Sequence, residues 1–325
     1  MSAIKESIKG NVVIIGIRLL FELMYEYWQL VINLGVVNTW GTKQKIQSYI
    51  DIESHAIEKG LSFKYPRVGF GEQRVIRLLE NLQRYTDKFH DTEFLKNPVN
   101  VIIDYIKYQE KHGIRNATII KKVDDLLNKY KIPLLAGEGG AKLIKRSEII
   151  PKIDFKTFAE QRHATRNFSE IPVSNDVIIA AIEIAKKSPS VCNRQSWHVH
   201  LFNSHEIKNR LLIFQKGNKG FTEYIDKVVL ITSNLNSFFI QEIHQGYIDG
   251  GLFAMSFIYA LHSFGIATVP LTTSFPFYYR HKLYKEFSIP KNEIPIMMIG
   301  IGNYPEEFMV AVSKRKDTDL FYTIH

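Results

Sequence analysis

The periodicity of the apolar residues changes near residue 150, and this change limits the folds available to the chain. Before it, apolar residues recur every three or four positions, as on one face of an α-helix. Two runs carry this pattern: Val75, Leu78, Leu79 and Leu82, and then Ile119, Val123, Leu126 and Leu127. After it, helical runs alternate with strand-like stretches at 197–202, 227–233, 266–271 and 294–302. The pattern predicts an all-helical domain over residues 1–150 and a layered domain with a sheet over residues 151–325.

Three glycines, Gly137, Gly139 and Gly140, lie near this boundary in the stretch "LLAGEGGAKLIK". Their spacing matches neither a dinucleotide-binding glycine motif nor a P-loop. We therefore interpret them as a flexible linker between the two domains.

The stretch "SPSVCNRQSWHVHLF", residues 188–202, places a polar loop led by proline directly before a strand. Such a loop either turns the chain or holds a flat, polar ligand. His198 and His200 share one face of the strand, but no third ligand follows at metal spacing, so we expect structural roles. Cys192 is expected to be a small packing group.

The composition is that of a globular protein, with 45% hydrophobic and 23% charged residues over 325 positions. A single cysteine excludes a disulfide framework and fits a reducing cytoplasm. The net charge of +9 is not gathered into a long basic block, so we expect no nucleic-acid partner. A modest basic surface would still suit an anionic ligand.

The most apolar segment covers residues 11–37 and resembles a membrane span at first sight. Arg18, Glu22 and Glu26 interrupt it at four-residue intervals, which places three charges on one helical face. Charges at mid-span are costly in a bilayer, and no signal cleavage site follows. We therefore predict a largely buried amphipathic helix, with attachment to a membrane surface as the minority alternative.

Motifs in the second domain occur in an order that resembles the FMN-dependent nitroreductase family. Arg162-His163-x-x-Arg166 comes first, followed by Ser188-Pro189-Ser190-x-x-Asn193-x-Gln195-x-Trp197-His198. Gly250-Gly251 then opens an apolar helix, "GIATVPL" follows it, and "IGIGNYPEE" with "VSKRK" lies near the end. The resemblance covers about residues 155–325. It implies an α+β fold, with a layered α/β/α domain around a mainly antiparallel sheet, preceded here by the all-helical domain.

The resemblance implies FMN as cofactor and NAD(P)H as electron donor. Arg162 and Arg315 would hold the FMN phosphate through forked, charge-assisted bonds, with His163 and Ala164 nearby. Arg166 would lie near the pyrimidine edge of the ring, where reduction places negative charge.

The loop after residue 188 would lie along the flavin. By resemblance, Pro189, Ser190 and Val191 would line the ring and Asn193 would offer its amide to the ring edge. Further contacts would come from Asn218, Leu271, Thr272 and Thr273. The family's flavin lies at a dimer interface, so the loop would reach the FMN whose phosphate the partner subunit holds. We therefore expect an obligate homodimer with helix 248–264 as its seam.

Several positions depart from the family pattern. Ala164 stands where a serine is usual, and Ser196 stands where a proline usually precedes the tryptophan. Only about a dozen residues separate strand 227–233 from the helix near 245, where many relatives carry extra helices over the flavin. We expect the helical domain to cover the pocket instead and its basic residues to favour an anionic substrate.

Three functions remain open on the sequence alone. The first is a flavoenzyme that passes electrons from NAD(P)H through FMN to an acceptor. The second is a flavin-binding or interaction protein without general reductase activity, and the third is a basic nucleic-acid-binding protein. The first is preferred because the residues match the family's motifs, and the third has no supporting motif. No side chain is nominated for proton transfer, because the flavin itself would do the chemistry.

Overall fold

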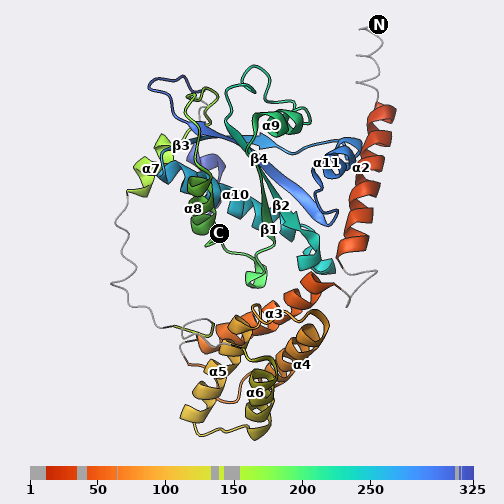
Figure 1. Cartoon of the computed structure of the whole chain (residues 1–325), viewed down its shortest axis with the longest axis vertical. Coiled ribbons are helices and arrows are strands. Elements are labelled where there is room, and N and C mark those ends of the chain that lie inside the picture. Colours follow the sequence, from red (N-terminus) through yellow and green to blue (C-terminus); the bar gives the residue numbers. More distant parts are fainter. Residues whose placement is uncertain are drawn as a thin grey trace.

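The computed structural model describes residues 12–34, 42–63, 65–132, 139–142, 154–311, 315 and 317–325. A group of helices, α3 to α6, lies beneath a sheet with helices on both of its faces, and α2 runs alongside the sheet domain (Figure 1). The predicted domain boundary at residue 150 and the linker residue Gly137 lie outside the described residues.

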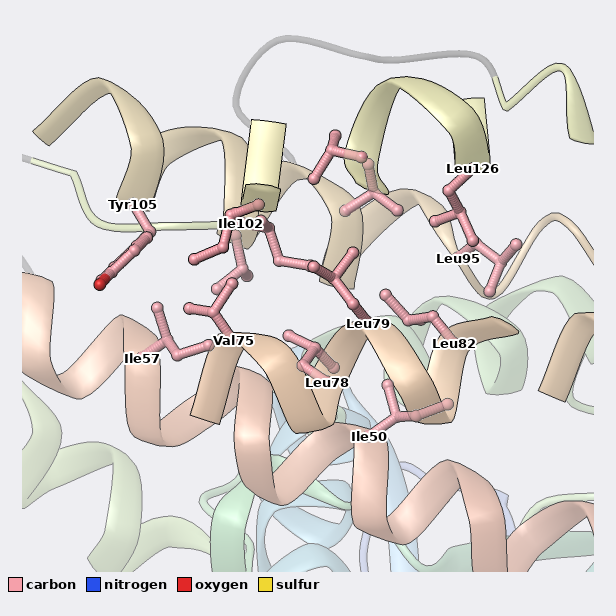
Figure 2. Close-up of a cluster of buried hydrophobic side chains, with 14 of the residues drawn as sticks. Ile50, Ile57, Val75, Leu78, Leu79, Leu82, Leu95, Ile102, Tyr105 and Leu126 are labelled. Atoms are coloured by element: carbon pink, nitrogen blue, oxygen red, sulfur yellow. The ribbon is translucent and has the colours of Figure 1, made fainter. Parts of the chain in front are cut away.

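The helical domain consists of α3 (Lys43–Leu61), α4 (Glu72–Phe89), α5 (Lys96–Lys111) and α6 (Ala117–Tyr130). Side-chain caps start two of them: Thr42 accepts a hydrogen bond from the Lys45 amide, and Asn116 accepts from the two amides at 118 and 119. Their apolar faces meet in one core, in which both predicted stripes are buried apart from the half-buried Leu127 (Figure 2). This core belongs to the helical domain alone, so the domain has its own source of stability.

The sheet contains β1 (Trp197–Phe202), β2 (Lys227–Asn234), β3 (Ile266–Thr272) and β4 (Glu293–Asn303) in the order β1-β2-β4-β3. Every neighbouring pair is antiparallel. Val228 faces Gly300, which in turn faces Val269, so the three inner positions form one row across the sheet. The predicted α+β fold with an antiparallel sheet is confirmed.

Helices cover both faces of the sheet. On one face, α8 (Asn175–Ala185) and α10 (Gln245–Ser263) pack on Val229, Ile231 and Ile299. On the other, α9 (His205–Leu212) and α11 (Phe277–Phe287) pack on the alternate positions Val228 and Leu230. Gly250 brings α10 close to the sheet, because a Cβ there would stand 2.6 Å from Ile296. The described part of the sheet domain also contains α7 (Phe155–Gln161) and the short 3-10 turns η2 (Val191–Asn193), η3 (Leu235–Ser237), η4 (Ile240–Glu242) and η5 (Thr318–Leu320).

Helix α2 (Val12–Asn33) corrects the expectation of a largely buried helix at 11–37. Its polar side is the side that docks: Glu22 accepts hydrogen bonds from the Phe277 amide at the start of α11, and Glu26 accepts one from the Tyr247 hydroxyl. Most of its apolar side chains point to solvent, including Leu20 at 56% and Trp28 at 60% exposure. The prediction was wrong because the acidic residues found partners on the sheet domain, which turned the apolar faces outward. Within the described segments, no helix combines the length and apolar character needed to cross a membrane.

The helical domain contacts the sheet domain through α3, which packs against η2 and η3. The Tyr49 ring meets the Phe239 ring edge-on, with their centroids 4.9 Å apart. The buried Lys45 ammonium lies over the same Phe239 ring and donates to the carbonyls of Leu34 and Phe238. Burial lowers the pKa of Lys45 to about 8. The contact places the helical domain against the loop that precedes β1.

Candidate functional site

The segment from Arg162 to Arg166 is attached to β3. Ala164 bridges Thr268, and the Thr165 amide donates to the Thr268 carbonyl at 2.9 Å. Burial, together with the nearby positive charges of Arg162 and His163, lowers the pKa of His262. Among the described residues, no carboxylate forms an ion pair with Arg162 or Arg166. Cations without a carboxylate partner fit an anionic group such as a phosphate.

The end of the same strand carries Leu271, Thr272 and Thr273. Leu271 is buried, Thr272 is exposed with its hydroxyl 2.7 Å from that of Ser274, and Thr273 donates to the Pro295 and Ile296 carbonyls. Thr268 and Thr272 are four residues apart on an extended strand, which corresponds to roughly 13 Å. One strand therefore presents the cationic segment and the Thr-Thr segment along a single sheet edge.

The loop at 189–193 is held in a fixed shape. The Val191 amide donates to the buried Asp249 carboxylate at 3.1 Å, and Ser190 accepts from the Gln195 amide at 3.0 Å. Cys192 and Asn193 both have left-handed backbone, with φ of 48° and 54°, which costs free energy in residues other than glycine. Pro189 and Asn193 are exposed and available to a ligand.

Arg194 attaches this loop to the segment that follows β2. Its fully buried guanidinium forms a forked ion pair with Glu242 and donates to the Ser237 carbonyl. A buried charge requires such partners, so the pair fixes the loop to the segment between β2 and α10.

The two halves of the predicted site lie on opposite edges of the sheet. The cationic segment is attached to β3, and residues 271–273 lie at the end of that strand, whereas loop 189–193 leads into β1. Two strands lie between these edges, which separates them by roughly 14 Å. Asn218 is buried and its amide donates to the Leu212 carbonyl, and Arg315 is exposed near the end of the chain. Within one chain, the predicted residues therefore form two groups.

A cavity of about 540 Å³ lies between the helical domain and the loop before β1. Helix α3 lines it with polar residues spaced three or four apart: Gln44, Gln47, Ser48, Asp51, Ser54, His55 and Glu58. The opposite wall is formed by residues 192–198 with Asn234, Ser237 and Glu293. Its volume is within the range of small-molecule sites.

The cavity wall is electrostatically unusual on the α3 side. Burial raises the pKa of Asp51 to about 7, although the positive charge of Arg194 opposes this. Burial also raises the pKa of Glu58, against a hydrogen bond from the Gly140 backbone. Perturbed carboxyl groups in a cavity mark a candidate site. This wall presents carboxyl groups, and the expectation that basic residues of the helical domain favour an anionic substrate stays a prediction.

Residues 159–229 match the family model described as the nitroreductase family. This stretch lies within the sheet domain, so the sheet domain is similar to proteins of the nitroreductase family. YodC of Bacillus subtilis (strain 168), a curated protein named for NAD(P)H nitroreductase activity, is 23% identical over 164 residues. The alignment covers 40% of this chain and 79% of YodC.

Solved structures of proteins described as nitroreductases are also similar to this chain. A nitroreductase family protein from Streptococcus pneumoniae TIGR4 has a TM-score of 0.45 and 20% identity, covering 53% of this chain and all (100%) of its own. A nitroreductase-like protein from Streptococcus mutans has a TM-score of 0.45 and 20% identity, with 53% and 98% coverage.

The short segment between β2 and α10 of the sheet domain is covered by α3. Residues 235–242 form only η3 and η4, and α3 packs against η3. The Arg194–Glu242 pair and the contact of Tyr49 with Phe239 both lie here. The helical domain thus covers the side of loop 192–198 on which the sheet domain has only the two short turns η3 and η4.

Sequence reasoning missed the residues of the helical domain that line the cavity. The signal was present, because Gln47, Asp51, Ser54 and Glu58 form a polar stripe of helical period beside the apolar stripe of α3. A polar stripe on a helix is normally a solvated face. Only the docking of α3 onto loop 192–198 shows that this stripe is a cavity wall. Of the two strand histidines, His200 bonds the Glu293 carboxylate at 2.7 Å, which is a structural contact of the kind expected.

Proposed function

We propose that this chain is an FMN-dependent oxidoreductase of the nitroreductase type, which takes hydride from NAD(P)H and passes electrons to an acceptor. The observation that carries the proposal is the cationic segment 162–166, which has no carboxylate partner among the described residues and lies inside the stretch that matches the family. The name of YodC supports NAD(P)H as the donor. FMN, when bound, supplies the electron-transfer chemistry.

In this proposal, the protein's own residues bind the FMN and orient its ring. Arg162, His163 and Arg315 hold the phosphate, and the backbone of Ala164 stays fixed because it is bonded to β3. Arg166 places a fixed cation at the ring's pyrimidine edge, where it stabilises negative charge. Its position is supported by the Phe221 ring, 6.0 Å away, and by a 3.4 Å hydrogen bond to the Ala164 carbonyl.

The proposed assembly is a homodimer in which loop 189–193 completes the partner's site. The placement of the two residue groups on opposite sheet edges favours this arrangement. A stripe of α10 supplies a candidate seam, since Ile248, Leu252 and Met255 are 52%, 44% and 37% exposed. The outward apolar face of α2 adds further surface that burial against a second copy would remove from water.

The helical domain is proposed as the cover of the acceptor pocket. Its α3 wall borders the loop proposed to touch the flavin, and a covered site excludes water and stray acceptors. Removing residues before 154 should then raise the rate at which NAD(P)H reduces oxygen. An unchanged oxygen rate, in a truncated protein that circular dichroism shows to be folded, would rule out a cover.

Spectroscopy of the purified protein tests the proposed function. We expect the absorbance of bound oxidised flavin and its loss when NADH or NADPH is added without oxygen. A protein that binds FMN but is not bleached by either donor is the flavin-binding alternative. A protein that does not bind added FMN at all contradicts the proposal.

A further inference from the structure

The cavity between α3 and loop 192–198 contains a buried polar group without a partner. Ser54 lines the cavity and is only 6% exposed, and its hydroxyl has no hydrogen-bond partner in the described structure. Buried hydroxyls are normally satisfied, because an unmade hydrogen bond costs free energy. An unsatisfied hydroxyl in the wall of a cavity of about 540 Å³ indicates a ligand that completes it.

Asp51 stands one helical turn before Ser54 on the same wall. Within the described ranges, no hydrogen bond or ion pair joins its carboxyl group to another residue, although Asp51 is only partly exposed. Asp51 and Ser54 therefore lie on the helix face that lines the cavity, and each carries a hydrogen-bonding group that the described residues leave unused.

The Lys and Arg side chains that line the described part of the cavity are paired with carboxylates. Arg194 is paired with Glu242, and Lys96 is paired with Glu93 at 2.6 Å. The described lining includes four carboxyl residues, Asp51, Glu58, Glu93 and Glu293, against the two cations Lys96 and Arg194. Among the described lining residues, an anionic ligand would meet no unpaired Lys or Arg side chain, whereas a cationic or donor-rich ligand would meet unused acceptors.

We propose that this cavity binds a small ligand with a cationic amine or several hydrogen-bond donors, with Asp51 and Ser54 as direct partners, and that this ligand is the electron acceptor. The second half of the proposal rests on the proposed function, because loop 189–193 links the cavity to the flavin. The first half concerns binding alone and does not require electron transfer.

Binding is tested on the full chain with three probes that share one ring: benzylamine, benzyl alcohol and benzoate. Saturation-transfer NMR at pH 8 gives a Kd for each. We expect benzylamine to bind roughly tenfold tighter than benzoate, since hydrogen bonds to charged groups discriminate by about that factor. Asp51→Asn should raise the Kd of benzylamine by a similar factor and leave the Kd of benzyl alcohol nearly unchanged.

Matched variants separate local from general effects. Asp124→Asn removes an exposed carboxylate from α6 outside the cavity lining and should change no Kd. Ser54→Ala should weaken benzyl alcohol and benzylamine alike, because it deletes a group that both can use. Equal binding of benzoate and benzylamine, or equal effects of Asp124→Asn and Asp51→Asn, would overturn the proposed binding.

Turnover separates the acceptor role from binding. The probes 4-nitrobenzylamine and 4-nitrobenzoate carry the same nitro group, which takes two electrons from NAD(P)H and two protons to give the nitroso compound and water. A KM for the amine roughly tenfold below that for the acid, lost in Asp51→Asn, supports the acceptor role. Equal KM values despite selective binding overturn it. Selective binding with no turnover of either probe contradicts the proposed oxidoreductase function and leaves the binding site standing.

Discussion

Substitution of Arg162 tests the proposed phosphate site most directly. It follows α7 directly, and no described carboxylate is paired with it. The double variant Arg162→Ala/Arg315→Ala should purify with little FMN, because losing one partner of a buried charge pair costs about 2–5 kcal/mol. The ratio of flavin to protein absorbance measures the loss. The control Arg74→Ala/Arg77→Ala removes two arginines that pair with Glu53 in the helical domain and should keep its FMN. A full FMN complement in the first variant would contradict the assignment.

Asp51 gives a pH-dependent prediction. Its folded pKa of about 7 lies above the ordinary value of 3.8, so the folded state favours the neutral carboxyl group. That contribution to stability is fully present below about pH 3.8 and is lost progressively as pH rises from there to about 7. Asp51→Asn should therefore melt at a higher temperature than the parent at pH 8.5, and this difference should shrink steadily as pH falls to about 4.

The measured quantity is the difference in melting temperature between the parent and Asp51→Asn, because other titratable groups also lie near Asp51. The titratable and charged residues around the cavity are His55, Glu58, Glu93, Lys96, Cys192, Arg194, His198 and Glu293, with Tyr85 also close enough to interact electrostatically. All of them are common to both proteins and largely cancel. If the melting difference between parent and variant does not change with pH, Asp51 is not the buried acid inferred here.

At the scale of elements, the loop before β1 depends on an ion pair that the sequence motifs do not mention. Glu242→Gln leaves the fully buried Arg194 guanidinium without its counter-charge. We expect a loss of about 3 kcal/mol in the free energy of unfolding by urea, because a buried charge without its partner is strongly destabilising. Glu286→Gln breaks the partly exposed pair with Arg210 and should cost about 0.2–1 kcal/mol. Equal costs for the two variants would show that the Arg194 pair does not hold the loop.

At the scale of the whole molecule, the proposed site is complete only in a dimer. Leu252→Glu places a charge in the exposed apolar stripe of α10 and should give a monomer that has lost FMN, because loop 189–193 can no longer reach the partner's flavin. Light scattering and flavin absorbance measure the two effects together. Ile213→Glu changes a residue that is 78% exposed at the end of α9 and should remain dimeric. A monomeric Leu252→Glu protein with stoichiometric FMN would contradict the shared site.

Local patterns in the sequence determined the elements and their order. Apolar spacing placed the stripes of α4 and α6, Ser174 capped α8 by accepting from the Asp176 amide, and strand 197–202 has the predicted bounds. These features depend on residues a few positions apart, so the chain itself encodes them. The order of motifs also indicated the family that residues 159–229 match.

Only the tertiary structure decided which surfaces meet. Helix α2 turned its acidic side inward because Phe277 and Tyr247, more than 200 residues away, offered donors to Glu22 and Glu26. The polar stripe of α3 became a cavity wall because α3 docked on η2 and η3 of the sheet domain. The sheet order placed residues 162–166 and 189–193 on opposite edges. Hydrophobic patterning states that a face can be buried, but the partner surface that buries it is set by long-range packing.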